Sequence, residues 1–74
     1  MRYEWTADTI RALRMRLRLT QADMGHITGV TRSAVAQWEA GQRSPSGART
    51  HALTTIQRLI DAGHIAVAER SAVR

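Results

Sequence analysis

Apolar side chains recur at helical spacing in four stretches of this chain, and short polar or glycine-containing links separate them. In the first stretch, Ile10, Leu13 and Leu17 stand at positions i, i+3 and i+7 and form one stripe of a helix. Thr6 precedes the stripe with a side chain that favours the N-cap position, and Asp8 suits the positive end of the helix dipole. The pattern predicts a first helix that ends near Leu17.

The next two stretches lie between residues 19 and 41, and a two-residue link that begins with Gly29 joins them. Thr20 is expected to cap the first of these helices, with Asp23 completing a capping box, and Thr31 is expected to cap the second. Gly29 suits the end of a helix because glycine adopts the left-handed conformation without steric cost. Helices joined by so short a link must cross steeply, which is the helix-turn-helix geometry.

The two faces of these helices differ in chemistry. Met24 and Ile27 are the expected buried residues of the earlier helix, and Val35 and Trp38 are those of the later one. The opposite side of the later helix carries small and polar side chains, namely Arg32 on its flank, Ser33, Ala36, Gln37 and Ala40. Without a bulky apolar group, this outward face is suited to close approach to a groove floor.

A fourth helix is expected after the polar connector 42–47, ending near Asp61 with Gly63 as its stop. Its apolar stripe consists of Leu53, Ile56 and Ile60, with Leu59 at the edge. The predicted helical core therefore covers about residues 7–62 of a single domain, 1–74.

Both ends of the chain admit more than one structure. Residues 1–5 alternate apolar and polar side chains, which fits a short strand or an extended arm. Residues 63–74 fit a short strand, a final helical turn or a tail. Three apolar side chains lack an evident partner in so small a core: Leu59, Ile65 and Val67. We therefore expect a dimer contact formed by the fourth helix and the C-terminal segment.

Composition favours a small domain with a polyanionic partner. The chain has 74 residues, 43% of them hydrophobic, which is enough for one core and leaves no room for a second domain. All 11 basic residues are arginine and only six residues are acidic, so the net charge is +5, which favours nucleic acid. No cysteine is present, and no apolar run approaches the roughly 20 residues of a membrane span, so we expect a cytoplasmic protein.

No set of side chains indicates catalysis or metal binding. Asp23 and His26 share a helix face at i and i+3, but the sequence places no nucleophile or third partner beside them. The three histidines are 25 and 13 residues apart, unlike the compact ligand spacings of metal sites. We expect neither an enzyme nor a cofactor or metal site.

The stretch IRALRMRLRLTQADMGHITGVTRSAVAQWEAGQRSPSG resembles the lambda-repressor-like helix-turn-helix domains of the Cro/C1 (XRE) class of bacterial and phage regulators. The combination of Leu-Thr-Gln, Gly-Val-Thr-Arg-Ser and Trp-Glu-x-Gly carries the resemblance, which covers about residues 10–60. It implies an all-α, compact domain of four to five helices. It also implies an autoregulatory transcriptional repressor, which controls its own operon and binds a palindromic operator in double-stranded DNA as a homodimer.

The resemblance assigns roles to individual residues. Gln21 matches a position that holds a DNA phosphate at the start of a helix, and Arg43 matches a backbone phosphate contact. The positions that reach phosphates and base edges are Thr31, Arg32, Ser33 and Gln37. Arg32 suits guanine and Gln37 suits adenine. Arg14 and Glu39 match a structural ion pair.

Two positions depart from the family pattern, and two other functions stay open. Gly25 stands where alanine is usual, and Ala36 stands where a larger polar side chain is common.

Domains of this kind also serve as antitoxins that bind both an operator and a toxin protein. Binding of a toxin would use the ends of the chain. A protein-interaction module without DNA binding is the other alternative, and it would lack the steep salt dependence of DNA binding.

Overall fold

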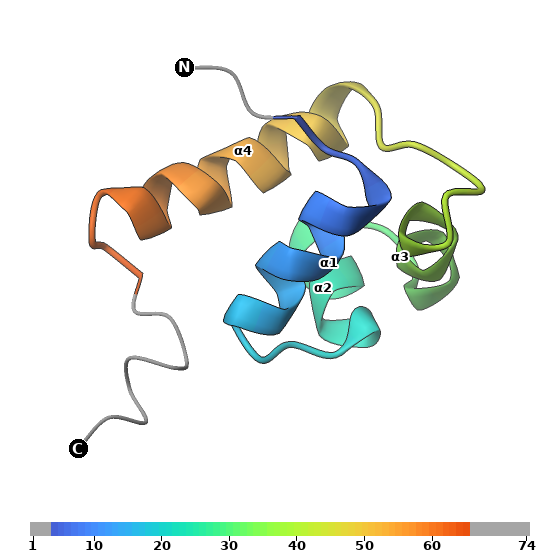
Figure 1. Cartoon of the computed structure of the whole chain (residues 1–74), viewed down its shortest axis with the longest axis horizontal. Coiled ribbons are helices and arrows are strands. Elements are labelled where there is room, and N and C mark those ends of the chain that lie inside the picture. The colour runs from blue at the N-terminus through green and yellow to red at the C-terminus, as the bar shows by residue number, and fades with distance from the viewer. Residues whose placement is uncertain (1–3, 66–74) are drawn as a thin grey trace.

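Among the residues that the structure describes, four α-helices form the fold: α1 (Ala7–Arg16), α2 (Gln21–Thr28), α3 (Arg32–Glu39) and α4 (Gly47–Asp61) (Figure 1). The computed structural model describes residues 4–65. Within this range there is no strand, so the all-α prediction is confirmed. Most of the N-terminal strand or arm expected at 1–5, and residues 66–74 of the C-terminal segment with Val67, lie outside the described residues.

The helix starts follow the predicted caps. The Thr6 hydroxyl accepts from the Thr9 backbone N–H at 3.2 Å, and the Thr9 side chain accepts from the Thr6 backbone in return. Thr20 forms the same reciprocal box with Asp23, where the hydroxyl accepts at 3.0 Å and the carboxylate at 3.1 Å. Thr31 accepts from the Ala34 N–H at 3.1 Å. Side chains close to each start therefore determine where α1, α2 and α3 begin.

The turn between α2 and α3 depends on two glycines. Gly29 adopts the left-handed conformation with φ 81° and ends α2, as predicted. Gly25 lies inside α2 at the crossing with the chain that enters α3, where a Cβ atom would stand only 2.7 Å from the Val30 carbonyl oxygen. The missing side chain therefore allows the backbone of the turn to lie directly against α2.

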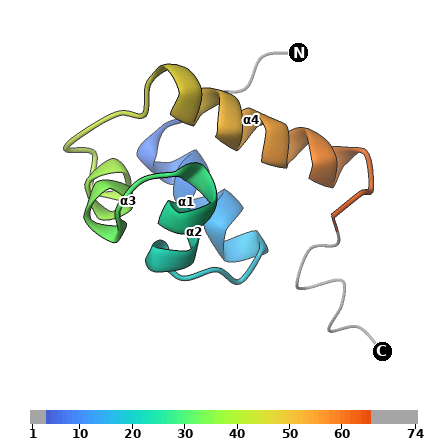
Figure 2. The same ribbon diagram turned by 180° about the vertical axis from the view of Figure 1, so that it is seen from behind.

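In the described part of the chain, seven buried apolar side chains from all four helices form the core: Ile10, Leu13, Met24, Val35, Trp38, Leu53 and Ile60. Each belongs to a stripe that the sequence predicts. In both views α4 runs along one edge of the molecule, and the connection from α3 loops outward before it reaches α4 (Figure 2).

Two predictions about apolar side chains are wrong. Ile27 is 47% exposed, and Thr28 takes its place on the buried side of α2 and donates to the Met24 carbonyl at 2.7 Å. At 100° per residue, Thr28 lies between the buried residues Met24 and Gly25 around the helix, whereas Ile27 lies 60° from Met24 on the other side and so falls outside the buried arc. Ile65, expected without a partner, is half-buried and packs against the core.

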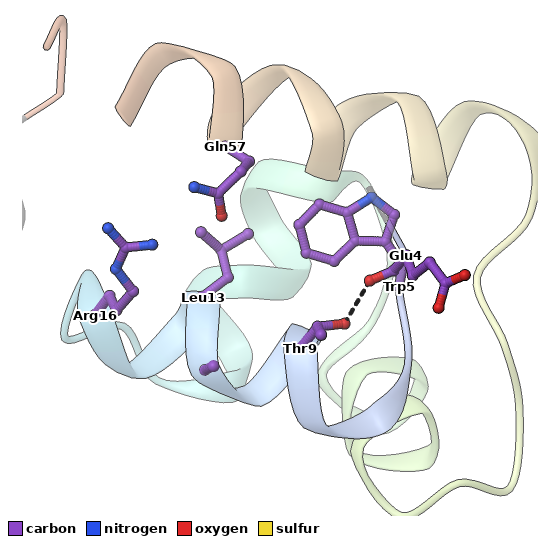
Figure 3. Close-up of a pocket in the computed structure, with 7 residues that line it drawn as sticks. Glu4, Trp5, Thr9, Leu13, Arg16 and Gln57 are labelled. Atoms are coloured by element: carbon purple, nitrogen blue, oxygen red, sulfur yellow. Dashed lines mark hydrogen bonds between the residues drawn. The ribbon is translucent and has the colours of Figure 1, made fainter. Parts of the chain in front are cut away.

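A side-chain hydrogen bond joins the segment before α1 to α4. The Trp5 indole Nε1 donates to the Thr54 hydroxyl at 2.9 Å, and the Thr9 hydroxyl donates to the Glu4 carbonyl at 2.8 Å. Beside Trp5, between α1 and α4, lies an open cavity of about 410 Å³ (Figure 3). Leu13 and Ala12 contribute its apolar lining, so packing between these two helices is incomplete.

Candidate nucleic-acid interface

The helix α3 presents one buried and one accessible side. Its buried side consists of Val35, Trp38 and Glu39. The residues predicted to contact DNA lie outside that side, namely Thr31, Arg32 and Ser33, which are exposed, and Gln37, which is half-buried. The N-terminal turn of α3 thus offers polar side chains to solvent, while Val35, Trp38 and Glu39 fix the helix in the core.

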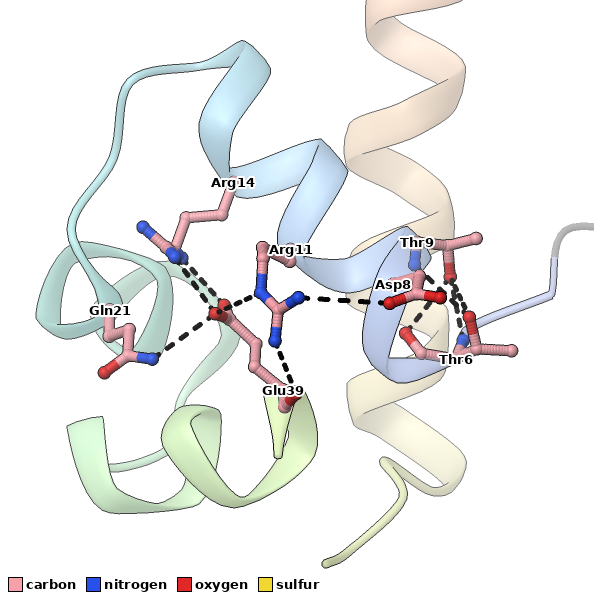
Figure 4. A network of polar contacts seen from close by, with 7 residues as sticks. All are labelled: Thr6, Asp8, Thr9, Arg11, Arg14, Gln21 and Glu39. Carbon is pink, nitrogen blue, oxygen red and sulfur yellow. Dashed lines mark hydrogen bonds and ion pairs between the residues drawn. The ribbon is translucent and has the colours of Figure 1, made fainter. Parts of the chain in front are cut away.

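Glu39, the last residue of α3, is the centre of a buried polar network (Figure 4). Its side chain is only 4% exposed and accepts from Arg14 Nε at 2.7 Å and from Arg14 Nη2 at 3.0 Å. Gln21 Nε2 donates to the same carboxylate at 3.3 Å. This carboxylate therefore links the start of α2 and the end of α3 to the last turn of α1. Arg14 and Glu39 form the ion pair that the resemblance implies.

Arg11 is a member of this network that the sequence analysis missed. Its Nη2 donates to the Glu39 backbone carbonyl at 2.7 Å, and its Nε lies 3.6 Å from Glu39 Oε1. A cation at the C-terminal end of α3 also complements the negative end of the helix dipole. The signal in the sequence is the spacing of Arg11 and Arg14, because residues at i and i+3 lie on the same face of a helix and can reach one partner.

The protonation of Glu39 follows from this environment. Burial raises the pKa of its carboxyl, but the hydrogen bonds from Arg14 and Gln21 and the charges of Arg14 and Arg11 lower it more, so the pKa lies below the ordinary value of 4.5. The hydrogen bond to Glu39 raises the pKa of Arg14. The pair is therefore ionised at neutral pH.

Gln21 and Arg43, both predicted to bind phosphate, are each placed beside another site residue. Gln21 is the first residue of α2 and uses one N–H of its amide for Glu39, which leaves the second for another acceptor. Arg43 Nη1 donates to Gln37 Oε1 at 3.2 Å. The structure thus brings together Arg43 and Gln37, which the sequence analysis treated as separate contacts.

Comparison with known proteins identifies this arrangement. The family profile described as helix-turn-helix matches residues 10–49, more than half of the chain. The chain belongs to the Cro/C1-type helix-turn-helix family. It is also 35% identical over 54 residues to Repressor protein C2 of Salmonella phage P22, a match that covers 73% of this chain and 25% of that repressor. The aligned part of this helix-turn-helix chain thus spans about a quarter of its relative, and no solved structure matches.

All the predicted site residues of this helix-turn-helix domain lie in or beside the matched region. Its turn consists of the Gly29 junction between α2 and α3, and Glu39 fixes the two helices on α1. Among residues 4–65, no helix has the length and apolar character needed to cross a membrane. The accessible side of α3 is the surface of this domain that is available for binding a partner.

Proposed function

We propose that this helix-turn-helix domain binds double-stranded DNA with α3 in the major groove and thereby represses transcription. The observation that carries the proposal is the two-sided character of α3. Val35 and Trp38 fix one side in the core, while Thr31, Arg32 and Ser33 at the N-terminal turn are exposed. In helix-turn-helix proteins the N-terminal residues of the second helix contact base edges.

The proposed contacts divide into two kinds. Arg32 and Gln37 have side chains suited to bidentate contact with base edges, and Ser33 is small enough to lie against them. Phosphate contacts are assigned to Gln21, Thr31 and Arg43, with the start of α2 contributing its positive dipole end. The net charge of +5 supports this assignment because phosphate neutralisation supplies much of the affinity for DNA.

We further propose that the protein acts as a homodimer on a palindromic operator, in the cytoplasm, and controls its own operon. A single α3 contacts too few base pairs for useful specificity, and a two-fold pair would contact half-sites about 34 Å apart. Leu59 on α4 is 37% exposed and is the described apolar residue that supports a dimer contact on that helix. A monomeric mass at micromolar concentration, both free and bound to an inverted repeat, would contradict the dimer. An inverted repeat upstream of its own gene would support autoregulation.

The DNA-binding proposal is tested by selecting sequences from randomised duplexes and measuring affinity for the enriched duplex at increasing salt. DNA binding predicts a steep fall in affinity with salt, whereas a protein-interaction module predicts no affinity for any duplex. Gln37→Ala should weaken binding to the enriched duplex by about 1–3 kcal/mol and leave the melting temperature nearly unchanged. Gln57→Ala on α4 is the matched control and should leave affinity unchanged. Equal binding by Gln37→Ala and the parent protein would show that the docking face is wrong.

A further inference from the structure

The contact between Arg43 and Gln37 fixes which end of the Gln37 amide is occupied. Arg43 Nη1 lies 3.2 Å from Gln37 Oε1. A guanidinium group has only N–H donors, so the amide must turn its oxygen toward it. The Gln37 Nε2 group, with its two N–H donors, is consequently the end of the amide that is left for another partner.

The backbone after α3 holds Arg43 in this position. Gly41, with φ 76°, turns the chain, and its N–H donates to the Trp38 carbonyl at 3.1 Å. The Gln42 N–H donates to the Gln37 carbonyl at 2.9 Å, and the Arg43 N–H lies 3.3 Å from the same oxygen. These bonds form the closing turn that commonly ends helices at a glycine. They fold residues 42 and 43 back over the last turn of α3, so the same residue, Gln37, anchors the Arg43 backbone and meets its side chain.

We propose that Arg43 is a specificity-determining residue that makes Gln37 select guanine instead of adenine. A glutamine contacts adenine by accepting from N6 with its oxygen while donating to N7 with its nitrogen. Here the oxygen already accepts from a cation, and the adjacent positive charge repels a further donor such as adenine N6. The remaining N–H groups match the two acceptors of guanine, O6 and N7. This inference rests on the proposed binding of α3 in the major groove.

The other bases are less suitable partners for a donor-only side chain. Thymine offers one acceptor, O4, next to a methyl group, and cytosine offers a donor in the major groove. The expected order on the contacted strand is therefore guanine first and cytosine last. Arg43 has four further N–H groups beyond the one used for Gln37, so this role is compatible with the phosphate contact proposed above.

The test compares the parent protein with Arg43→Ala on pairs of duplexes that differ at one base pair. That base pair is the one at which Gln37→Ala loses its preference in selection from randomised duplexes. The parent should bind the guanine duplex about fivefold or more tightly than the adenine duplex. Arg43→Ala should lower that ratio by about fivefold or more, because the amide regains its free oxygen. A ratio of affinities cancels the general loss caused by removing a charge.

Arg58→Ala is the matched control, since Arg58 is an exposed arginine in the last turn of α4, and its ratio should equal that of the parent. A parent protein that prefers adenine, or an Arg43→Ala ratio within about twofold of the parent, overturns the inference. So does an enriched duplex without any base pair that depends on Gln37, although DNA binding would then stand. Absence of enrichment together with absence of salt-dependent binding overturns the proposed function itself.

Discussion

The two sides of α1 are built in different ways. Toward α3, Arg11 and Arg14 surround the buried Glu39 carboxylate (Figure 4), and both guanidinium groups donate hydrogen bonds to Glu39. Toward α4, Leu13 and Trp5 line an open cavity of about 410 Å³ (Figure 3), and the Trp5 indole donates a hydrogen bond to the Thr54 hydroxyl. Directional polar contacts therefore position α3, whereas mainly apolar contacts attach α4.

This difference matches what each helix has to do under the proposed function. Base contacts require side chains on α3 to be placed to within a fraction of an ångström, and a carboxylate with several fixed donors restricts both rotation and translation of the helix end. Covering a core requires only contact area and tolerates small shifts. We expect disruption of the Glu39 network to change stability and α3 position together, and disruption on the α4 side to change stability alone.

The largest effect is expected for Glu39→Ala. Loss of the carboxylate leaves Arg14, whose side chain is only 18% exposed, without its ionic partner, and the free energy of unfolding should fall by about 3 kcal/mol. Urea denaturation measures this change. Asp8→Ala is the control, because the Asp8 side chain is 94% exposed and its Oδ1 lies 3.9 Å from Arg11 Nη1. Loss of this exposed pair should lower the free energy of unfolding by less than about 1 kcal/mol. A loss below about 1 kcal/mol in Glu39→Ala would mean that the network does not hold α3.

A smaller effect on the same network is expected at acid pH. Because the pKa of Glu39 in the folded protein lies below its ordinary value of 4.5, the carboxylate adds stability that is complete above that value and lost as pH falls through the lowered pKa. Hydrogen bonds from the backbone and the side chain of Thr20 also lower the pKa of Asp23. In the unmodified protein, both Glu39 and Asp23 therefore contribute to the loss of stability at acid pH. Denaturation between about pH 7 and pH 3 should show a shallower acid loss in Glu39→Gln. If the free energy of unfolding falls equally with pH in the two proteins, Glu39 is not a source of the acid-dependent loss of stability.

Gly25→Ala should come next in size, and it tests the junction that joins α2 to α3. A new Cβ would stand 2.7 Å from the Val30 carbonyl oxygen, and backbone atoms must move to make room. The gain in helix propensity, up to about 1 kcal/mol, opposes this cost. We expect a net loss of about 1 kcal/mol in the free energy of unfolding. Ala22→Gly at an exposed position of α2 measures the propensity term separately, and a stabilised Gly25→Ala protein would show that the junction widens freely.

Local features of the fold could be predicted from sequence because short-range chemistry determines them. Thr6, Thr20 and Thr31 cap helices through bonds to backbone groups three residues away, and such bonds do not depend on the rest of the fold. Gly29 likewise ends α2 through its own conformation. The four helices and their junction were therefore predictable, and the family resemblance added the Arg14–Glu39 pair.

Contacts between distant residues could not be derived in this way. Arg11 and Glu39 are 28 positions apart, and their contact exists only once α1 and α3 have packed. Ile27 was misplaced because the packing of neighbouring helices determines which side of a two-turn helix is buried, and periodicity over eight residues fits two answers. The bond from Arg43 to Gln37 depends on the turn after α3, whose path the sequence pattern does not determine.

The smallest effect is expected for Thr54→Val, which removes the hydrogen bond from Trp5 to α4. The Trp5 indole N–H loses the Thr54 hydroxyl as an acceptor at 2.9 Å, and the free energy of unfolding should fall by about 0.5–1 kcal/mol. Thr55→Val is the matched control, because Thr55 is the exposed neighbour in the same helix and carries the same change of side chain. Affinity for DNA should be equal in both variants, since α4 is attached independently of the Glu39 network. A loss of affinity in Thr54→Val alone would show that the two sides of α1 are coupled.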